Sequence, residues 1–407
     1  MPVVVLGSGI IGLSTAYFLS LPPPSPPQIH IVDPNPDLFR ITASGLAGGF
    51  LAKDWFAPPV APLGAFSFDL HRRLARECGG AAKWGWCETE GWSLDRGGVS
   101  DNDEGFGGEA GVDLDWLMSG SSRATLLEMQ EGTEEEAGTC PKWVRAQPNA
   151  FKPITDRMST AQVDPMRLCE FLLSECLARG VTLHSPARAT AIIDGDTVRV
   201  VSGDGSETVD IRCESLIVAA GAWTPAVFRT LFPHAPRVPR VNPLAGYSVL
   251  VRSPVWKPIT PKEEARVCHA VFTSDSSGFS PEVFARAGGE IWLGGLNAKH
   301  LPLPPLPSPL VLPPSSTPPP LPGSPTSQIE ITRTSLCFRP VSPTGRPIIG
   351  QVSPSDIFPG GPSNMNVFLG TAHGPWGISL SLGTGWVLGE MVRGEETSVD
   401  VSALGVW

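Results

Sequence analysis

Three glycines near the N-terminus, Gly7, Gly9 and Gly12, have the spacing G-x-G-x-x-G, and Asp33 follows Gly12 by twenty-one positions. The glycines stand between a short apolar run and residues at helical spacing, which predicts a strand, a tight turn and a helix. In such a unit Gly7 permits the turn, Gly9 lets the backbone approach a pyrophosphate, and Gly12 lets the helix lie against the strand. An acid at the end of the next strand can accept hydrogen bonds from an adenosine ribose. The spacing predicts a dinucleotide site. The alternative is an ordinary strand-helix unit with Asp33 as a helix cap.

The elements that would position these residues form two groups. Strands at 3–6, 29–32, 181–184, 215–220 and 366–370, helices at 13–19, 64–78, 164–180 and 375–393, and a hairpin-like pair at 190–201 and 206–212 indicate an α/β part. Alternating segments at 247–252, 270–273, 282–286 and 290–293 indicate an antiparallel sheet. Cys169 and Cys176 share the apolar face of a predicted helix and are predicted to be core thiols. A dense run of small residues at 42–50 suits a backbone that must contact something flat.

Composition narrows the class of protein. The 407 residues are 41% hydrophobic and 17% charged, which predicts a globular chain with two domains or one large insertion. The net charge of −10 and the absence of a basic cluster argue against nucleic acid or an anionic membrane as a partner. The eight cysteines contain no C-x-x-C pair, so we expect no metal site and a reducing compartment such as the cytoplasm. The first basic residue is Arg40 and no apolar run is long enough to span a bilayer, which argues against targeting and membrane segments.

Two low-complexity regions interrupt the predicted elements. Residues 97–139 are acidic and rich in glycine, and we interpret most of them as a solvated loop. Residues 301–328 are dominated by proline and serine, which predicts a disordered insertion or a polyproline-type loop. A role of this insertion in binding a protein partner is a further alternative.

These segments, in this order, resemble the D-amino-acid oxidase, glycine oxidase and sarcosine oxidase superfamily of FAD-dependent oxidoreductases. The nearest resemblance is to an uncharacterised fungal branch with segments similar to 43–52, 245–248 and 372–377; it is weakest at 97–150 and 300–328. The resemblance implies a fold of class α/β plus α+β, with a Rossmann-like FAD-binding domain of the glutathione-reductase type and an antiparallel-sheet substrate domain. It places the FAD-binding domain at 1–70, 152–238 and 329–407, the substrate domain at 71–151 and 239–300, and the proline-rich insertion at 301–328.

The same resemblance implies which residues bind FAD. It assigns the pyrophosphate and ribose to the N-terminal motif, with the segment 220–223 also near the pyrophosphate. It assigns the adenine to Ala189, and the flavin ring to the small-residue run and to residues 374–378. The residues are Gly7, Ser8, Gly9, Ile10, Ile11, Gly12, Asp33, Ser44, Gly45, Ala47, Gly48, Gly49, Ala189, Ala220, Gly221, Trp223, His373, Gly374, Trp376, Gly377 and Ile378. A helix beginning at Pro375 would also direct its N–H groups at N1 and O2 of the flavin. Leu46 departs from the family, which often has a basic residue there.

The resemblance also assigns the substrate residues. The Arg339-Pro340 pair is similar to a family segment whose arginine binds the substrate carboxylate, a task that suits the planar fork of a guanidinium. The alternative is a structural arginine at a domain interface. Tyr247 is a second candidate for substrate contact, or else a half-buried strand residue. Cys337 lies where some relatives attach flavin covalently, although we expect non-covalent FAD and an inert buried thiol.

The function implied is oxidation of the C–N bond of an amino acid or N-substituted amino acid by hydride transfer to flavin N5. Oxygen is the expected electron acceptor, with hydrogen peroxide as product. Two alternatives remain: a flavin dehydrogenase with another acceptor, and a non-catalytic protein that FAD stabilises and that binds partners through its low-complexity regions.

Overall fold

The structure is a computed structural model. It describes residues 2–21, 27–95, 123, 141, 143–144, 151–155, 157–259, 267–274, 280–307, 328–357 and 364–405. The expected acidic loop at 97–139 lies outside these residues except for Arg123, as do residues 308–327 of the proline-rich insertion.

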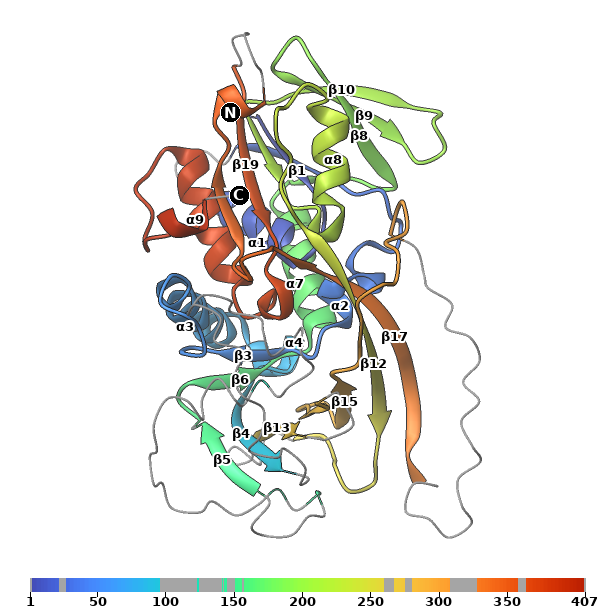
Figure 1. The fold of residues 1–407 in the computed structure, drawn as a ribbon, viewed down its shortest axis with the longest axis vertical. Helices are drawn as coiled ribbons and strands as arrows, with labels where there is room; N and C mark the ends of the chain where they lie inside the picture. The colour runs from blue at the N-terminus through green and yellow to red at the C-terminus, as the bar shows by residue number, and fades with distance from the viewer. Residues whose placement is uncertain are drawn as a thin grey trace.

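The first structural unit is a six-stranded sheet in the order β18-β19-β11-β1-β2-β7. Five of its strands are mutually parallel and β18 pairs antiparallel at one edge. The strands are β1 (Pro2–Leu6), β2 (Gln28–Val32), β7 (Thr182–His184), β11 (Ser215–Val218), β18 (Ile348–Gln351) and β19 (Asn366–Thr371). The apolar strands predicted from the sequence thus pair across nearly the whole length of the chain (Figure 1).

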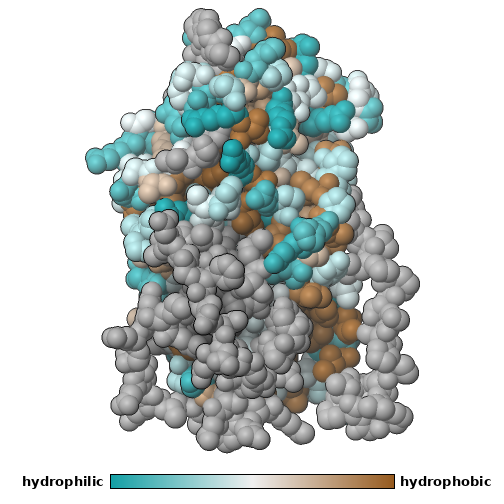
Figure 2. All heavy atoms as spheres, in the orientation of Figure 1, coloured by the Kyte–Doolittle hydropathy of each residue, from teal (hydrophilic) through white to brown (hydrophobic). Residues whose placement is uncertain are grey.

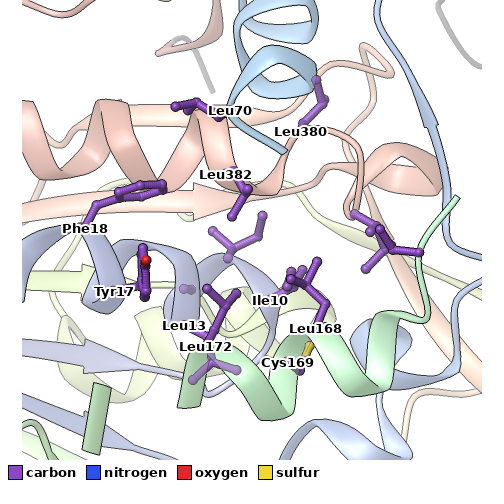
Figure 3. Close-up of a cluster of buried hydrophobic side chains, with 14 of the residues drawn as sticks. Ile10, Leu13, Tyr17, Phe18, Leu70, Leu168, Cys169, Leu172, Leu380 and Leu382 are labelled. Atoms are coloured by element: carbon purple, nitrogen blue, oxygen red, sulfur yellow. The ribbon is translucent and has the colours of Figure 1, made fainter. Parts of the chain in front are cut away.

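Both faces of this sheet are covered, which explains why its central strands consist largely of apolar residues. On one face Val3 and Val5 join a core with the helices α1 (Ile10–Leu19), α7 (Pro165–Ala178), α3 (Ala61–Cys78) and α9 (Ser381–Arg393). Figure 3 shows side chains from these four helices meeting, including Leu13, Leu172 and Leu382. On the other face Val4 and Leu6 pack with α8 (Thr224–Leu231) and with a three-stranded sheet of β8 (Ala187–Ile193), β9 (Thr197–Ser202) and β10 (Thr208–Arg212).

The second unit is a ten-stranded sheet in which most neighbours are antiparallel. Its strands are β3 (Phe50–Ala52), β4 (Cys87–Asp95), β5 (Phe151–Thr155), β6 (Thr160–Gln162), β12 (Asn242–Arg252), β13 (Cys268–Ser274), β14 (Glu282–Ala285), β15 (Glu290–Gly294), β16 (Asn297–Ala298) and β17 (Glu330–Val341). The four alternating segments of the sequence correspond to β12, β13, β14 and β15, as predicted. Long strands β12 and β17 run side by side from the six-stranded sheet into this unit (Figure 1).

Several local signals act as the sequence predicts. The side chain of Asp164 accepts hydrogen bonds from Met166 N and Arg167 N at the start of α7, and Gly180 ends that region with φ of 85°. Cys169 and Cys176 are both completely buried on α7. Two further short α-helices of the described residues are α2 (Ala43–Leu46) and α4 (Gly80–Trp84).

The predicted start of the last helix is wrong. The sequence predicts one helix from Pro375 to Arg393, whereas the structure has a 3-10 turn, η6 (Gly374–Trp376), and then α9 from Ser381. The reason lies in α3: Ser67 Oγ accepts a hydrogen bond from Gly383 N (3.0 Å) and donates one to Ser379 O (2.6 Å). The N-terminus of α9 is therefore capped by α3, and its dipole is not that of a helix beginning at residue 375.

The start of the proline-rich segment is packed, so the disordered alternative does not hold for residues 301–307. Leu301 and Leu303 pack beside Phe338, and Trp223 Nε1 donates a hydrogen bond to Pro304 O at 2.8 Å. On the face in Figure 2, hydrophobic and hydrophilic residues of the described chain are interspersed. Large exposed hydrophobic residues such as Met158 and Val255 are ordinary features of a protein surface.

Candidate active site

A cavity of about 440 Å³ connects the two sheets. One part of its wall comes from the carboxyl ends of β1, β2, β11 and β19, and another from β12, β14 and β17. The carboxyl edge of a parallel sheet is the usual position of a ligand site in α/β proteins.

The cavity brings together most of the residues that the sequence predicts to bind cofactor or substrate. Those that line it are Gly7, Gly9, Ile10, Ile11, Asp33, Ser44, Ala47, Gly48, Gly49, Ala189, Ala220, Gly221, Trp223, His373, Gly374, Gly377, Ile378 and Arg339. Ser8, Gly12, Gly45, Trp376 and Tyr247 do not line it. These five lie behind the wall or on another face.

The glycine turn needs its glycines for packing. Gly7 has φ of 108°, and a Cβ there would lie 2.5 Å from Ala219 O. A Cβ on Gly12 would lie 2.0 Å from Gly7 O and 3.2 Å from Val5 Cγ1, so this position brings α1 against β1. A Cβ on Gly45 would lie 2.5 Å from Phe39 O, so there is no room for a side chain at this position either. Gly12 and Gly45 therefore shape the wall from behind.

The carboxylate of Asp33 is fixed by three donors. Its Oδ2 accepts from Ser8 N (2.8 Å) and Ser8 Oγ (2.7 Å), and its Oδ1 accepts from Asn35 N (2.9 Å). Ser8 thus orients the acid from behind. Because a carboxylate has about four acceptor positions, about one remains for a hydroxyl in the cavity.

The small-residue run is tied to the start of α1. Ser44 Oγ accepts a hydrogen bond from Ile10 N at 2.9 Å, and Gly9, the residue before the helix, has no side-chain cap of its own. The first N–H groups of a helix have no intrahelical acceptor, so Ser44 satisfies one of them from a distant segment. This contact places the run 43–49 beside the glycine turn.

The chain turns sharply at residues 372–378, where Ala372 and Gly374 have φ of 61° and 57°. Two buried histidines support this turn: His373 Nε2 lies 3.0 Å from Thr384 Oγ1, and His71 Nε2 donates to Ile378 O at 3.0 Å. Burial lowers the pKa of His71 to about 4 and that of His373 to about 3. Both rings are therefore neutral at physiological pH.

Arg339 reaches the cavity from β17, where Cys337 also lines the wall. Its Nη1 donates a hydrogen bond to Asn297 Oδ1 at 2.6 Å, and a Cβ on Gly246 of β12 would lie 2.0 Å from that same nitrogen. Within the described part of the chain Arg339 makes no ion pair. The guanidinium is thus held by a neutral acceptor, over a glycine that leaves room for it, and keeps its positive charge for the cavity.

Tyr247 lies on the opposite face of β12. Its neighbours Gly246 and Ser248 line the cavity, while its own side chain packs beside Phe338 and Leu301. Successive side chains of a strand point to opposite faces, so the predicted contact of Tyr247 with substrate is not supported by this geometry. Of the two interpretations of Tyr247, the one as a half-buried strand residue fits.

Trp376 also lies behind the cavity wall, with its ring centroid 4.9 Å from that of Phe56.

Two residues of the cavity wall have no signal in the sequence, namely Arg123 and Glu282. They form a buried ion pair, with Nε and Oε1 2.9 Å apart and Nη2 donating to Oε2 at 3.2 Å. The Arg123 guanidinium also stacks over Trp376, 4.5 Å from the ring centroid. Burial lowers the pKa of Arg123, repulsion from Arg339 lowers it further, and Glu282 opposes both effects. Arg123 belongs to the segment interpreted as a solvated loop, and only the fold brings it to β14.

Comparison with known proteins identifies the family. Residues 2–391 match the family described as FAD dependent oxidoreductase, DAO. The chain belongs to this family. The FAD-dependent oxidoreductase fold and the FAD cofactor predicted from the sequence are confirmed.

Individual relatives agree with the family. The Schizosaccharomyces pombe protein C1F5.03c, named as a candidate oxidoreductase, is 25% identical, and the match covers 99% of this chain and 97% of that protein. Glycine oxidase from Geobacillus kaustophilus has a similar structure, with a TM-score of 0.68 and 18% identity over 100% of this chain and 98% of that chain. Iminodiacetate oxidase from Chelativorans sp. BNC1 follows with a TM-score of 0.65 and 18% identity over 99% and 98%.

The cavity of this FAD-dependent oxidoreductase fits its cofactor. Gly7, Gly221 and Gly374 line the wall with positive φ, and nothing lies within 4 Å of a Cβ built on Gly221, so bare backbone faces the cavity there. The start of α1 supplies N–H donors of the kind that bind a pyrophosphate.

Among the described residues no cluster of three metal-ligating side chains is found, and no helix there is long and apolar enough to span a membrane.

Cys337 lines the cavity of this oxidoreductase as a buried thiol. Burial raises the pKa of Cys337, while the charges of Arg339 and Arg333 oppose that shift. A protonated thiol is a weak nucleophile, which agrees with non-covalently bound FAD.

Acid is expected to destabilise this oxidoreductase through His71 and His373. Above about pH 6.5 both histidines are neutral in the folded and in the unfolded chain. Below about pH 6.5 they bind protons in the unfolded chain but stay neutral in the folded chain. The free energy of unfolding therefore decreases as the pH is lowered. With folded pKa values of about 4 and about 3, the loss is about 3 kcal/mol per histidine by pH 4. Urea unfolding between pH 7.5 and 4 measures it. His71→Gln, which can still donate to Ile378 O, should flatten the dependence; an unchanged slope would contradict the assignment.

Proposed function

We propose that this chain oxidises the C–N bond of an amino acid or N-substituted amino acid whose carboxylate binds Arg339. The observation that carries the proposal is a cavity-lining guanidinium that Asn297 orients without neutralising. A carboxylate is the anion that matches its planar fork through two parallel hydrogen bonds. Each hydrogen bond to a charged group contributes about 1.5–3 kcal/mol.

The charges around the cavity favour a substrate with one negative charge. Arg123, Arg339 and Glu282 together carry two positive charges and one negative charge, which leaves one net positive charge for a bound anion. Asp33 and Arg188 also line the cavity, and their opposite charges cancel in this sum. Phe284 and Phe50 supply apolar surface nearby. A monocarboxylate with an apolar or small body suits this wall.

We propose that FAD is held by the glycine turn, Asp33 and the run 43–49, with its ring near residues 373–378 and the substrate side at Arg339. When bound, FAD would supply a two-electron acceptor, flavin N5, for the hydride of the substrate Cα–H bond. The chain's residues contribute orientation, because Arg339 fixes the carboxylate and thereby the Cα–H direction, and no protein base is required. The product imine then hydrolyses in water.

Similar structures support this substrate class. Their names describe oxidases of glycine, a primary amine with one carboxylate, and of iminodiacetate, a secondary amine with two carboxylates. Oxygen as the electron acceptor, with hydrogen peroxide as product, is part of the proposal. A dehydrogenase with another acceptor is the alternative that the test below separates.

The test is an anaerobic titration of the holoprotein with primary, secondary and N-methyl amino acids of both configurations and with the matching amines that lack a carboxylate. We expect bleaching of the flavin absorbance by at least one amino acid and none by its decarboxylated analogue. Return of the colour on admitting air, with peroxide release, would support oxygen as acceptor. Slow recovery in air with fast recovery by an artificial acceptor would support a dehydrogenase. Equal reduction by amines lacking the carboxylate would contradict the proposal.

A further inference from the structure

Three consecutive carbonyl groups of the run 43–49 are bound by the ten-stranded sheet. Trp292 Nε1 on β15 donates to Leu46 O at 3.2 Å. Arg286, which follows β14, donates from Nη2 to Ala47 O at 2.7 Å. The same guanidinium reaches Gly48 O from Nη2 at 2.8 Å and from Nε at 3.2 Å. Leu46, Ala47 and Gly48 therefore all direct their carbonyls at two side chains.

The orientation of these carbonyls determines that of the next N–H groups. In a planar trans peptide the N–H points opposite to the C=O, so the N–H groups of Ala47, Gly48 and Gly49 point away from Arg286 and Trp292. Ala47, Gly48 and Gly49 all line the cavity. Within the described chain, none of these three N–H groups has a backbone or side-chain acceptor. Gly48 and Gly49 are buried and Ala47 is partly buried, so a ligand in the cavity is needed to satisfy these donors.

Burial of the charged Arg286 side chain costs free energy, so packing alone does not explain it. Its exposed fraction is 5%, and among the described residues it makes no ion pair, so its charge is met by backbone carbonyls. A cation on the carbonyl side of a peptide polarises the unit and strengthens its N–H as a donor. Phe284 fills the space beside Gly48, because a Cβ built on Gly48 would lie 2.5 Å from the Phe284 ring. The same ring stacks on Trp292, with the ring centroids 5.2 Å apart.

We propose that Arg286 and Trp292 are positioning residues that hold the N–H groups of Ala47, Gly48 and Gly49 as a donor set for the flavin ring. The donors would favour negative charge on the ring and so raise its reduction potential. Arg286 and Trp292 act through the peptide units and do not themselves bind the cofactor. This inference rests on the proposed placement of the flavin against the run 43–49.

The experiment compares Arg286→Met and Trp292→Phe with Arg333→Met as a matched control. Arg333 is another partly buried cation of the same sheet, and it repels Arg286, but it donates no hydrogen bond to the run 43–49. The measurements are the FAD dissociation constant of the apoprotein, from flavin fluorescence, and the midpoint potential of bound flavin. For Arg286→Met we expect at least tenfold weaker FAD binding and a lower potential. For Trp292→Phe we expect about threefold weaker binding, corresponding to one lost neutral hydrogen bond.

The control separates positioning from long-range charge. Arg333→Met should leave both the FAD affinity and the potential unchanged, because Arg333 donates no hydrogen bond to the run 43–49. Equal shifts in Arg286→Met and Arg333→Met would overturn the inference, as would wild-type affinity and potential in Arg286→Met. If Arg286→Met does not fold, Trp292→Phe decides, because phenylalanine keeps the stack on Phe284 and loses only the donor; an unchanged affinity and potential would then overturn it. If the wild-type protein binds FAD but no amino acid reduces the bound flavin, the proposed function is contradicted. This inference would not be affected by that result.

Discussion

Replacement of Arg339 with Ala is expected to lower kcat/KM for the amino-acid substrate by about 100-fold or more, because two charge-assisted hydrogen bonds to its carboxylate are lost. The FAD content should remain that of the wild type, since Arg339 belongs to the β17 side of the cavity and its described hydrogen bond is to Asn297. Anaerobic reduction rates at several substrate concentrations measure the effect.

Two further variants sharpen this experiment. Arg339→Lys keeps the charge but loses the planar fork, and should be intermediate. Arg252→Ala removes an exposed arginine of the same sheet that pairs with Glu290, and should behave like the wild type. A normal KM and turnover in Arg339→Ala would show that the arginine is structural and would remove the basis of the proposed substrate class.

Replacement of Gly12 with Ala is expected to be strongly damaging, although it adds only one methyl group. The added Cβ would be 2.0 Å from Gly7 O, which is backbone of the turn itself, so α1 must move off β1. Overpacking of this kind costs about 1–3 kcal/mol and more where backbone must shift. The glycine turn would lose its shape, so we also expect FAD uptake to fail. Thermal unfolding and flavin content after purification are the measurements.

Gly288→Ala is the matched control for this substitution. No atom lies within 4 Å of a Cβ built on Gly288, so stability and FAD content should be unchanged. A Gly12→Ala protein that is as stable as the control and equally yellow would show that α1 does not depend on close contact with Gly7.

The charges of the cavity give Arg123 and Glu282 a shared role with Arg339. Because Arg123 and Arg339 repel each other, Glu282 must neutralise one of them before a single carboxylate can balance the other. Under the proposed function, the pair would set the charge of the substrate side and Arg339 would provide the contact. This division explains why a buried carboxylate can lie in the wall of a cavity proposed to bind an anion.

The N-terminal half of the site could be predicted from the sequence because its signals are local. A glycine turn, the strand before it and the helix after it lie within about twenty residues, and Asp33 follows at the end of the next strand. The apolar strands carry the same kind of information, since burial on both faces of a parallel sheet demands it. The composition of the small-residue run marked it as a candidate contact surface, and the family resemblance added its role at the flavin and the role of Arg339.

The sequence by itself therefore determined the dinucleotide turn, the two kinds of sheet and the FAD-dependent family. Only the tertiary structure decided which distant residues meet around the cavity: Arg123 pairs with Glu282, Arg286 binds the carbonyls of Ala47 and Gly48, and Tyr247 lies on the opposite face of β12. The physical reason is that these contacts join residues up to about two hundred and forty positions apart, and their energies depend on distance and burial in space. Strand alternation and the capping of α9 by Ser67 likewise depend on register and packing, which become visible only once the chain is folded.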